Sequence, residues 1–196
     1  MVRTVLMMYV TLVPTILAGI FNMVWCKLKV LKFAARPIDG GRNFVDGRRI
    51  FGDSKSWNGL IGYILFNTLF MVLWGIVCAK GGFEDLDFFY ISNANTLKFN
   101  LVVGVLLGLG YALFELPNSF LKRRLNIDQS KGISGAAKVF FVFLDQADSV
   151  FGVALVVWLF YELGIGLYIL YVLIGAVTHI LLNMMLYFMH LRKNLF

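Results

Sequence analysis

The sequence is poor in charged residues and cysteine, and each shortage excludes a class of protein. Only 15% of the 196 residues are charged, whereas 60% are hydrophobic and the mean hydropathy is +0.80. Soluble domains have about 45–50% apolar residues, so the composition indicates an integral membrane protein. The two cysteines, Cys26 and Cys78, are too few for a disulfide framework. They are expected near opposite membrane faces, so we expect both thiols to be free.

Uncharged sequence is abundant, in five stretches that each approach the ~20 residues needed to cross a bilayer. The stretches cover about 4–26, 59–79, 99–120, 146–161 and 167–189, and a start near residue 135 is also compatible with the fourth. They predict an all-α fold, a polytopic membrane bundle of five transmembrane helices that forms a single domain over residues 1–196. Gly104 and Gly108 form a GxxxG pattern, which indicates close helix packing.

Lysine and arginine are distributed unevenly among the expected loops. Fifteen of the 18 lie in the segments 27–58 and 122–144 and in the carboxyl-terminal tail. Because cytoplasmic loops are enriched in these residues, we expect an outside amino terminus and a cytosolic carboxyl terminus. The two basic loops, about 27–58 and 122–145, are then expected on the cytosolic side. Their charge could attract anionic lipid headgroups or bind a polyphosphate.

Two acidic residues stand where the fourth apolar stretch begins. Asp145 and Asp148 lie within the sequence Leu-Asp-Gln-Ala-Asp. A carboxylate in a membrane helix costs roughly 2.5–3.5 kcal/mol on insertion scales. Residues three apart share one helix face, and like charges that close repel unless a proton or a cation lies between them. The pair therefore predicts a metal site where this helix enters the bilayer.

Both basic loops have features that suit phosphate binding. Residues 36–59 are rich in glycine, aspartate and arginine, and Lys55 lies between two serines. Glycine lets a backbone approach an anion closely, and arginine matches phosphate oxygens in pairs. The triplet Lys122-Arg123-Arg124 follows the third span, at the depth of a lipid phosphate. The alternatives are an ordinary solvated loop in the first case and a stop-transfer segment in the second.

Three motifs follow one another along the chain. They are Lys55-Ser56-Trp57-Asn58-Gly59, Ser119-Phe120-Leu121-Lys122-Arg123-Arg124 and Leu144-Asp145-Gln146-Ala147-Asp148. With these motifs and five spans, nearly the whole chain resembles the integral-membrane CTP:lipid-phosphate cytidylyltransferases, most closely the CDP-archaeol synthase branch. It departs from the family at Ser56, where threonine is usual, at Asn58, where the branch has arginine, and at Glu115, where the wider superfamily has aspartate.

The resemblance implies that a lipid phosphate attacks the α-phosphorus of CTP, which yields a CDP-lipid and pyrophosphate. It leaves the lipid open between archaetidic and phosphatidic acid types. The implied cofactor is Mg²⁺, and the implied partners are CTP and a lipid phosphate, without nucleic acid; a homodimer stays open. The implied location is the plasma membrane, with a cytosolic active site. Because the second pKa of a phosphate is about 6, the nucleophile is already largely anionic and needs no dedicated base.

The resemblance also implies roles for the polar residues of the motifs. Asp145 and Asp148, with Glu115 nearby, are expected to hold one or two Mg²⁺ ions. Lys122 and Arg123 are expected to hold the lipid phosphate, and Lys55 to hold the CTP phosphates. The other residues expected at the substrates are Asn22, Asp39, Arg48, Arg49, Asp53, Ser56, Ser119 and Arg124.

Three of these residues keep alternative interpretations. Asp39 and Asp53 could order the first loop, contact the ribose or join the metal site. Asn22, late in the first span, is either a site residue or the donor of an interhelical hydrogen bond.

Two classes without this activity are also compatible with a membrane bundle. A transporter is expected to place polar groups near the bilayer midplane, whereas the informative polar residues here lie at one edge. A lipid-binding scaffold accounts for the basic loops but leaves Asp145 and Asp148 without a purpose.

Overall fold

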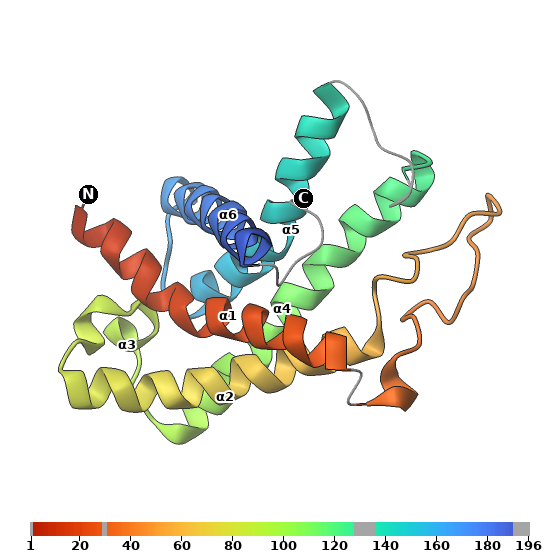
Figure 1. Cartoon of the computed structure of the whole chain (residues 1–196). Helices are drawn as coiled ribbons and strands as arrows, with labels where there is room; N and C mark the ends of the chain where they lie inside the picture. Colours follow the sequence, from red (N-terminus) through yellow and green to blue (C-terminus); the bar gives the residue numbers. More distant parts are fainter. Residues whose placement is uncertain (1, 29–30, 128–135, 190–196) are drawn as a thin grey trace.

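The structure is a computed structural model that describes residues 2–28, 31–127 and 136–189. The α-helices are α1 (Val2–Leu28), α2 (Trp57–Gly81), α3 (Phe88–Ser92), α4 (Leu97–Arg124), α5 (Ala136–Phe160) and α6 (Ile165–Phe188). Two short 3-10 helices, η1 (Lys32–Ala34) and η2 (Glu84–Leu86), lie in the connections (Figure 1). Pairing between extended segments is limited, over the described residues, to two isolated bridges in the loop that precedes α2.

Five helices are long and apolar enough to cross a membrane. They are α1, α2, α4, residues 140–160 of α5, and α6. The predicted all-α bundle of five transmembrane helices is therefore confirmed. Cys26 and Cys78 are both free thiols, as expected.

The connection between α4 and α5 differs from the sequence prediction. The third span is expected to end near residue 120, but α4 continues to Arg124 and includes Pro117. Three basic residues in its last turn favour this continuation, because cations are stabilising near the carboxyl end of a helix dipole. Helix α5 begins at Ala136, in agreement with the earlier of the two expected starts, and Asp145 and Asp148 lie on it as expected. The parts of the predicted loops at 29–30 and 128–135, and the tail at 190–196, lie outside the described residues.

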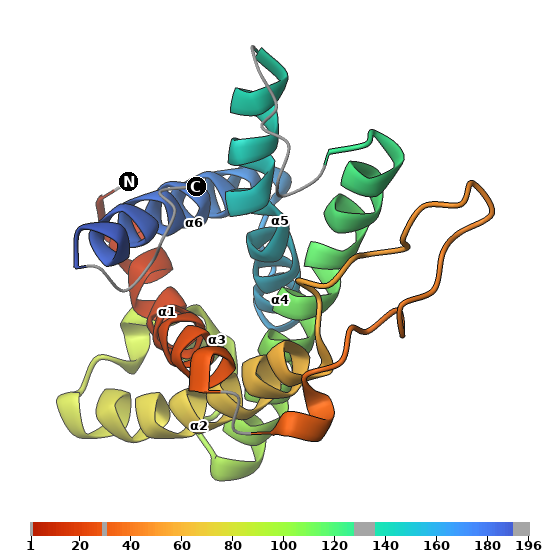
Figure 2. The ribbon, with the colours of Figure 1, turned by 45° about the vertical axis from the view of Figure 1, so that its right-hand side comes forward.

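The five long helices form an incomplete ring in the order α1, α2, α4, α5, α6 (Figure 2). Neighbours in this order pack extensively, whereas α1 and α6 make few contacts with each other. A cavity of about 310 Å³ lies inside the ring, and all five helices contribute residues to its walls. The end of α4 and the start of α5 project from the bundle on the side that carries the loop 31–56.

Glycines allow the helices to approach each other closely. A Cβ atom on Gly104 or Gly108 would lie 2.4 or 2.5 Å from main-chain atoms of α2, so the predicted GxxxG packing is confirmed. A Cβ atom on Gly152 of α5 would lie 2.1 Å from the carbonyl oxygen of Gly110 of α4. The backbones of α4 and α5 therefore touch at this crossing, which brings together the two helices that carry the predicted acids.

The connection between α2 and α4 packs over the opposite end of the bundle and contains a buried acid. Asp87 caps the amino terminus of α3, where its side chain accepts a hydrogen bond from the main-chain N–H of Phe89 at 2.9 Å. The indole of Trp74 donates to the same carboxylate at 3.0 Å, and the Thr11 hydroxyl lies 3.3 Å away. Burial raises the pKa of Asp87 to about 6 despite these hydrogen bonds. This end of the bundle, called the α3 end below, therefore contains one fully buried carboxyl group.

Candidate active site

Helices α4 and α5 each present polar side chains on one face near the projecting end. On α4 these are Glu115, Asn118 and Lys122, whose spacings of three and four residues put them on the same side of the helix. On α5 they are Asp145 and Asp148. Because the helices cross closely at Gly110 and Gly152, the two polar faces meet.

Asn118 joins the two predicted metal ligands. Its side-chain amide nitrogen donates to Asp145 Oδ1 at 2.7 Å and to Asp148 Oδ2 at 2.8 Å. The Lys122 ammonium forms an ion pair with the other oxygen of Asp145. The two carboxylates, which the sequence predicts to share a face, therefore converge on one nitrogen. Sequence reasoning missed Asn118, although its position between Glu115 and Lys122 on one helical face was a usable signal.

A second ion pair joins the start of α2 to α4. The Lys55 ammonium contacts Glu115 Oε2, and only 21% and 17% of the two side chains is exposed. Burial opposes the charge of Lys55, but attraction to Glu115 outweighs it and raises the pKa of the lysine; Asp148 and Asp145 act in the same direction. Lys55 is therefore cationic at neutral pH.

These six side chains form the carboxylate–lysine cluster: Lys55, Glu115, Asn118, Lys122, Asp145 and Asp148. When all are ionised, three carboxylates and two ammonium groups leave one negative charge. Like charges held this close favour a cation beside them. The cluster thus unites five residues predicted from the sequence with one that was not.

Asp39 organises the first loop. Its buried carboxylate accepts hydrogen bonds from the main-chain N–H groups of Gly41, Phe51 and Gly52, at 3.0, 3.0 and 2.9 Å, and from Arg49 at 2.7 Å. Burial opposes the negative charge, but these donors outweigh it and hold the pKa of Asp39 well below its usual range. Of the roles left open by the sequence, the geometry supports ordering of the loop.

Arg49 links two of the loop acids. It donates to Asp39 and, at 2.7 Å, to Asp53, whose side chain is 82% exposed. Asp53 therefore lies at the surface of the loop, whereas Asp39 lies inside it.

The loop is attached to the end of α4 by arginines. The Arg124 guanidinium lies over the ring of Phe120 on α4, 4.6 Å from its centroid, and over the ring of Phe44 in the loop at 5.1 Å. It also donates to the carbonyl oxygen of Arg49 at 2.6 Å, and Arg48 donates to the carbonyl oxygen of Arg124. The contacts of Arg48, Arg49 and Arg124 thus hold the loop against α4.

The remaining predicted residues lie beside the cluster or in the helix interfaces. Arg123 donates to the carbonyl oxygen of Phe51 at 3.3 Å. Ser56 caps α2 by accepting from the Gly59 N–H at 3.2 Å, and Asn22 donates to the Gly59 carbonyl oxygen at 3.2 Å. The contact of Asn22 fits the interhelical alternative. Ser119 is buried on α4.

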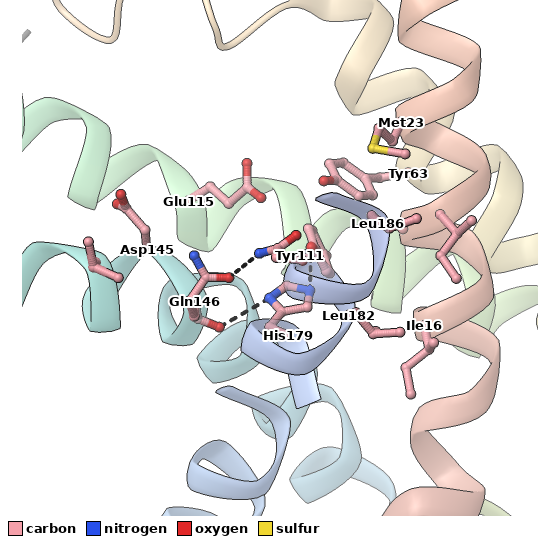
Figure 3. A pocket seen from close by; sticks show the side chains of 14 residues that line it. Ile16, Met23, Tyr63, Tyr111, Glu115, Asp145, Gln146, His179, Leu182 and Leu186 are labelled. Carbon is pink, nitrogen blue, oxygen red and sulfur yellow. Dashed lines mark hydrogen bonds between the residues drawn. The ribbon is translucent and has the colours of Figure 1, made fainter. Parts of the chain in front are cut away.

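Two cavities reach the cluster from different sides. The cavity inside the ring includes Asp145 and Glu115 in its wall, together with Tyr63 and Tyr111 (Figure 3). A second cavity of about 400 Å³ lies between α4 and α5 and has an almost wholly apolar lining. Its wall consists of Phe114, Pro117, Leu121, Leu144 and Phe151, with Asn118 and Asp148 as the polar members. The apolar groove between α4 and α5 therefore reaches the cluster at Asn118 and Asp148.

The donor set at this point fits a magnesium ion. Mg²⁺ in proteins is usually held by one or two carboxylates together with substrate phosphates and water. Asp145 and Asp148 supply two adjacent carboxylates, and Asn118 Oδ1 is buried without a hydrogen-bond partner. The described residues contain no group of three or more His, Cys, Asp or Glu side chains suited to a metal.

A membrane bundle with a charged cluster at one end, reached by an apolar groove, defines a multi-pass membrane enzyme whose site suits a substrate with an apolar part and a charged part. Comparison with known proteins identifies its family. The family described as CarS-like, CDP-archaeol synthase, matches residues 1–196, and the chain belongs to this family. The predicted class is thereby confirmed: a CTP-dependent cytidylyltransferase of the membrane that forms a CDP-lipid. A transporter or a scaffold is not favoured.

Individual relatives agree with this result. A CDP-archaeol synthase of Methanocaldococcus jannaschii is 30% identical over 151 residues, which cover 77% of this chain and 78% of the relative. One from Thermofilum pendens is 31% identical over 172 residues, or 87% of this chain and 71% of the relative. One from Thermococcus kodakarensis is 43% identical over 99 residues, about half of each chain.

A solved structure shares the fold. It is described as an intramembrane enzyme for archaeal membrane lipids biosynthesis, and it superposes with a TM-score of 0.59 at 23% identity. The match covers 89% of this chain and 91% of the other. At this identity the likeness shows the fold alone.

Proposed function

We propose that the carboxylate–lysine cluster is the catalytic centre, at which CMP passes from CTP to an archaeol-type lipid phosphate. The observation that carries the proposal is the convergence of Asp145 and Asp148 on Asn118, where an apolar groove reaches the cluster. A lipid phosphate needs an apolar environment for its chains and a cationic, metal-binding environment for its headgroup. The archaeol-type lipid is supported by the name that the relatives share.

Asp145 and Asp148 are the proposed magnesium ligands, with the unpaired Asn118 Oδ1 directly beside them. The ion, when bound, would neutralise negative charge on the phosphates and on the leaving pyrophosphate. Glu115 is held by Lys55 and is the nearby acid that keeps this lysine in place.

Lys122 is proposed to bind the lipid phosphate. Its ammonium lies beside Asp145, and Leu121, its neighbour on α4, lines the apolar groove. A phosphate held there would place its chains along Phe114 and Phe151. One phosphate oxygen forms a bond to the α-phosphorus of CTP, and the bond from that phosphorus to the β-phosphate oxygen breaks. No side chain has to remove a proton, because the attacking phosphate is already largely anionic.

Lys55 is proposed to bind the phosphates of CTP, and Arg123 is proposed to hold the lipid phosphate together with Lys122. Lys55 lies between the loop and Glu115, and Arg123 lies where the loop meets α4. The reaction then requires the loop to be ordered, which the buried Asp39 and its four donors achieve. In this arrangement, Arg48, Arg49 and Arg124 support the phosphate-binding loop by attaching it to α4.

The plasma membrane is the proposed location, and the cytosolic face is the proposed side for the cluster. The support is the excess of lysine and arginine in the segments at this end of the bundle. The same side is where CTP is available.

Mass spectrometry of reaction products tests the function. Purified protein would be incubated with CTP, Mg²⁺ and either an isoprenoid ether lipid phosphate or a diacyl lipid phosphate. We expect a CDP-lipid and pyrophosphate from the ether lipid, and no product when Mg²⁺ is replaced by a chelator. A CDP-lipid from the diacyl substrate alone would correct the lipid class. The absence of any CDP-lipid from either substrate would overturn the proposed function.

A further inference from the structure

Gln146 lies between the two acids of α5 and has no role in the reaction described above. Helix α6 contacts this residue at two points (Figure 3). The ring nitrogen Nδ1 of His179 lies 3.1 Å from the main-chain carbonyl oxygen of Gln146. The side-chain amide of Asn183 donates to Gln146 Oε1. Both the backbone and the side chain of Gln146 are thus held by residues one turn apart on α6.

The hydrogen bonds define the state of the imidazole. A carbonyl oxygen can only accept, so Nδ1 of His179 carries the proton of this bond. The other ring nitrogen lies 2.9 Å from the Tyr111 hydroxyl, which is able to donate to it. Tyr111 precedes Glu115 by one turn of α4. A hydrogen-bonded path therefore runs from α4 through His179 to the backbone of α5.

Contact with a main-chain atom restricts the rotation and translation of α5 at the site. A shift of one residue along a helix moves each side chain by about 1.5 Å and turns it by about 100°. Functional groups usually need to be held within about 0.5 Å of their working geometry. The carbonyl of Gln146 is one residue from Asp145 and two from Asp148. A contact at this point acts on both carboxylates together.

The expected contribution of these bonds to folding is small. Hydrogen bonds between membrane helices contribute little to folding on average. The bundle is also held by the close crossing of α4 and α5 at Gly110 and Gly152. Loss of one α6 contact should therefore leave the fold intact. Outer partners of metal ligands, by contrast, commonly change metal affinity by about 10–100-fold.

We propose that His179 and Asn183 are positioning residues, which set the placement of Asp145 and Asp148 by holding Gln146. The inference rests on the proposed function, because it takes these two acids as the metal ligands. It predicts that removing the α6 contacts weakens metal binding without unfolding the protein.

Direct Mn²⁺ binding to the purified full chain tests this, with free Mn²⁺ measured by electron paramagnetic resonance. In His179→Asn the amide nitrogen replaces Nδ1 and keeps the bond to the Gln146 carbonyl, whereas in His179→Gln it replaces Nε2 and loses that bond. We expect His179→Asn to bind within about twofold of the natural chain. We expect His179→Gln and Asn183→Leu to bind about tenfold more weakly.

A matched control lies on the same helix. The Thr178 hydroxyl donates to the Ile174 carbonyl oxygen within α6, so Thr178→Val removes a hydrogen bond without touching α5. It should leave Mn²⁺ affinity unchanged. If His179→Gln fails to fold, Asn183→Leu and Gln146→Met test the hydrogen bond between the side chains of Asn183 and Gln146 instead. These two remove the same bond, so the double variant should bind no more weakly than either single one.

The outcomes separate this inference from the proposed function. Absence of Mn²⁺ binding to the natural chain, or unchanged binding in both Asp145→Asn and Asp148→Asn, would overturn the metal assignment itself. If those acids are required but His179→Gln and Asn183→Leu bind Mn²⁺ like the natural chain, only the positioning role is overturned. Equal weakening by His179→Asn and His179→Gln would also contradict it, because the carbonyl contact would then not matter.

Discussion

The two ends of the bundle both bury carboxylates, but they stabilise them in different ways. At the α3 end, Asp87 is held by the N–H groups of Phe89 and Trp74, which are neutral donors on rigid elements. At the other end, Asp145 and Asp148 share the amide of Asn118, and Asp145 also contacts the ammonium of Lys122. A neutral donor on a rigid element stays with its acceptor, whereas a lysine at the end of a flexible chain can exchange one anion for another.

The surroundings of the acids at the two ends make this contrast clearer. Near Asp87, Asn95 donates to the Gly75 carbonyl oxygen at 2.7 Å and to Glu84 at 2.6 Å. Asn100 donates to Asn95 at 2.8 Å and accepts from Tyr90 at 3.0 Å. These side chains satisfy one another as a structural network. In the carboxylate–lysine cluster, by contrast, Asn118 Oδ1 has no hydrogen-bond partner among the described residues. The difference indicates which buried acids hold the fold and which are available to a ligand.

The largest expected effect is loss of activity from the cluster. Asp145→Asn and Asp148→Asn each remove a proposed metal ligand, and each should lower kcat/KM by about 1,000-fold, or ~4 kcal/mol. The thermal unfolding temperature in detergent should change little, because asparagine keeps the shape of the side chain. Near-normal turnover in either variant would show that the replaced acid is not a required metal ligand. The contrast between structural acids at one end and ligand-binding acids at the other would then be lost.

A smaller effect, on stability and not on chemistry, is expected at the α3 end. Asp87→Ala leaves the N–H groups of Trp74 and Phe89 without an acceptor, which should lower the free energy of unfolding by about 3 kcal/mol. Denaturation in detergent measures this, and the folded fraction should keep its specific activity. Asp85→Ala is the control, because its ion pair with Arg3 is two-thirds exposed and should contribute little.

A third prediction separates the substrates. Lys122→Ala should raise the KM for the lipid phosphate by about tenfold, or ~1.4 kcal/mol, because a cationic contact with the headgroup is lost. The KM for CTP should rise much less. Lys98→Ala, an exposed lysine at the start of α4, provides the control. Equal changes in both KM values would contradict a headgroup role for Lys122.

A fourth prediction is a dependence of stability on pH at the α3 end. The pKa of Asp87 is raised to about 6 in the fold, above the ~3.9 of an unfolded aspartate, so the folded state binds more protons between these values. Stability should then fall as pH rises from about 4 to 6, by about 1 kcal/mol per pH unit. Denaturation at several pH values measures the slope, and Asp87→Asn should flatten it. A slope of the opposite sign would show that Asp87 is stabilised in its charged form.

Several features follow from local sequence because they depend on short-range spacing. The five spans are readable from uncharged runs, and the shared face of Asp145 and Asp148 follows from helical geometry. The contribution of Lys55 and Lys122 is indicated by the motifs around them. The ends of α4 and α5 are less predictable, since basic residues and Pro117 are compatible with either a helix or its termination.

Side-chain contacts between distant segments cannot be predicted in this way, because they depend on which helices and loops meet. The sequence does not reveal that Arg124 packs on Phe44 and Phe120, or that Asp39 is enclosed by the amides of its own loop. It likewise does not identify the partner of His179, which is the backbone of Gln146, 33 residues earlier.

The sequence by itself determined a five-helix membrane protein with a pair of acids and two basic motifs, because hydrophobicity and helical periodicity act over a few residues. Only the tertiary structure decided that Asn118 joins those acids, that Lys55 and Lys122 neutralise their neighbours, and that α6 holds α5 through Gln146. The physical reason is that ion pairs and hydrogen bonds of this kind exist only where helix crossings, here the contact of Gly110 with Gly152, bring distant residues within about 3 Å.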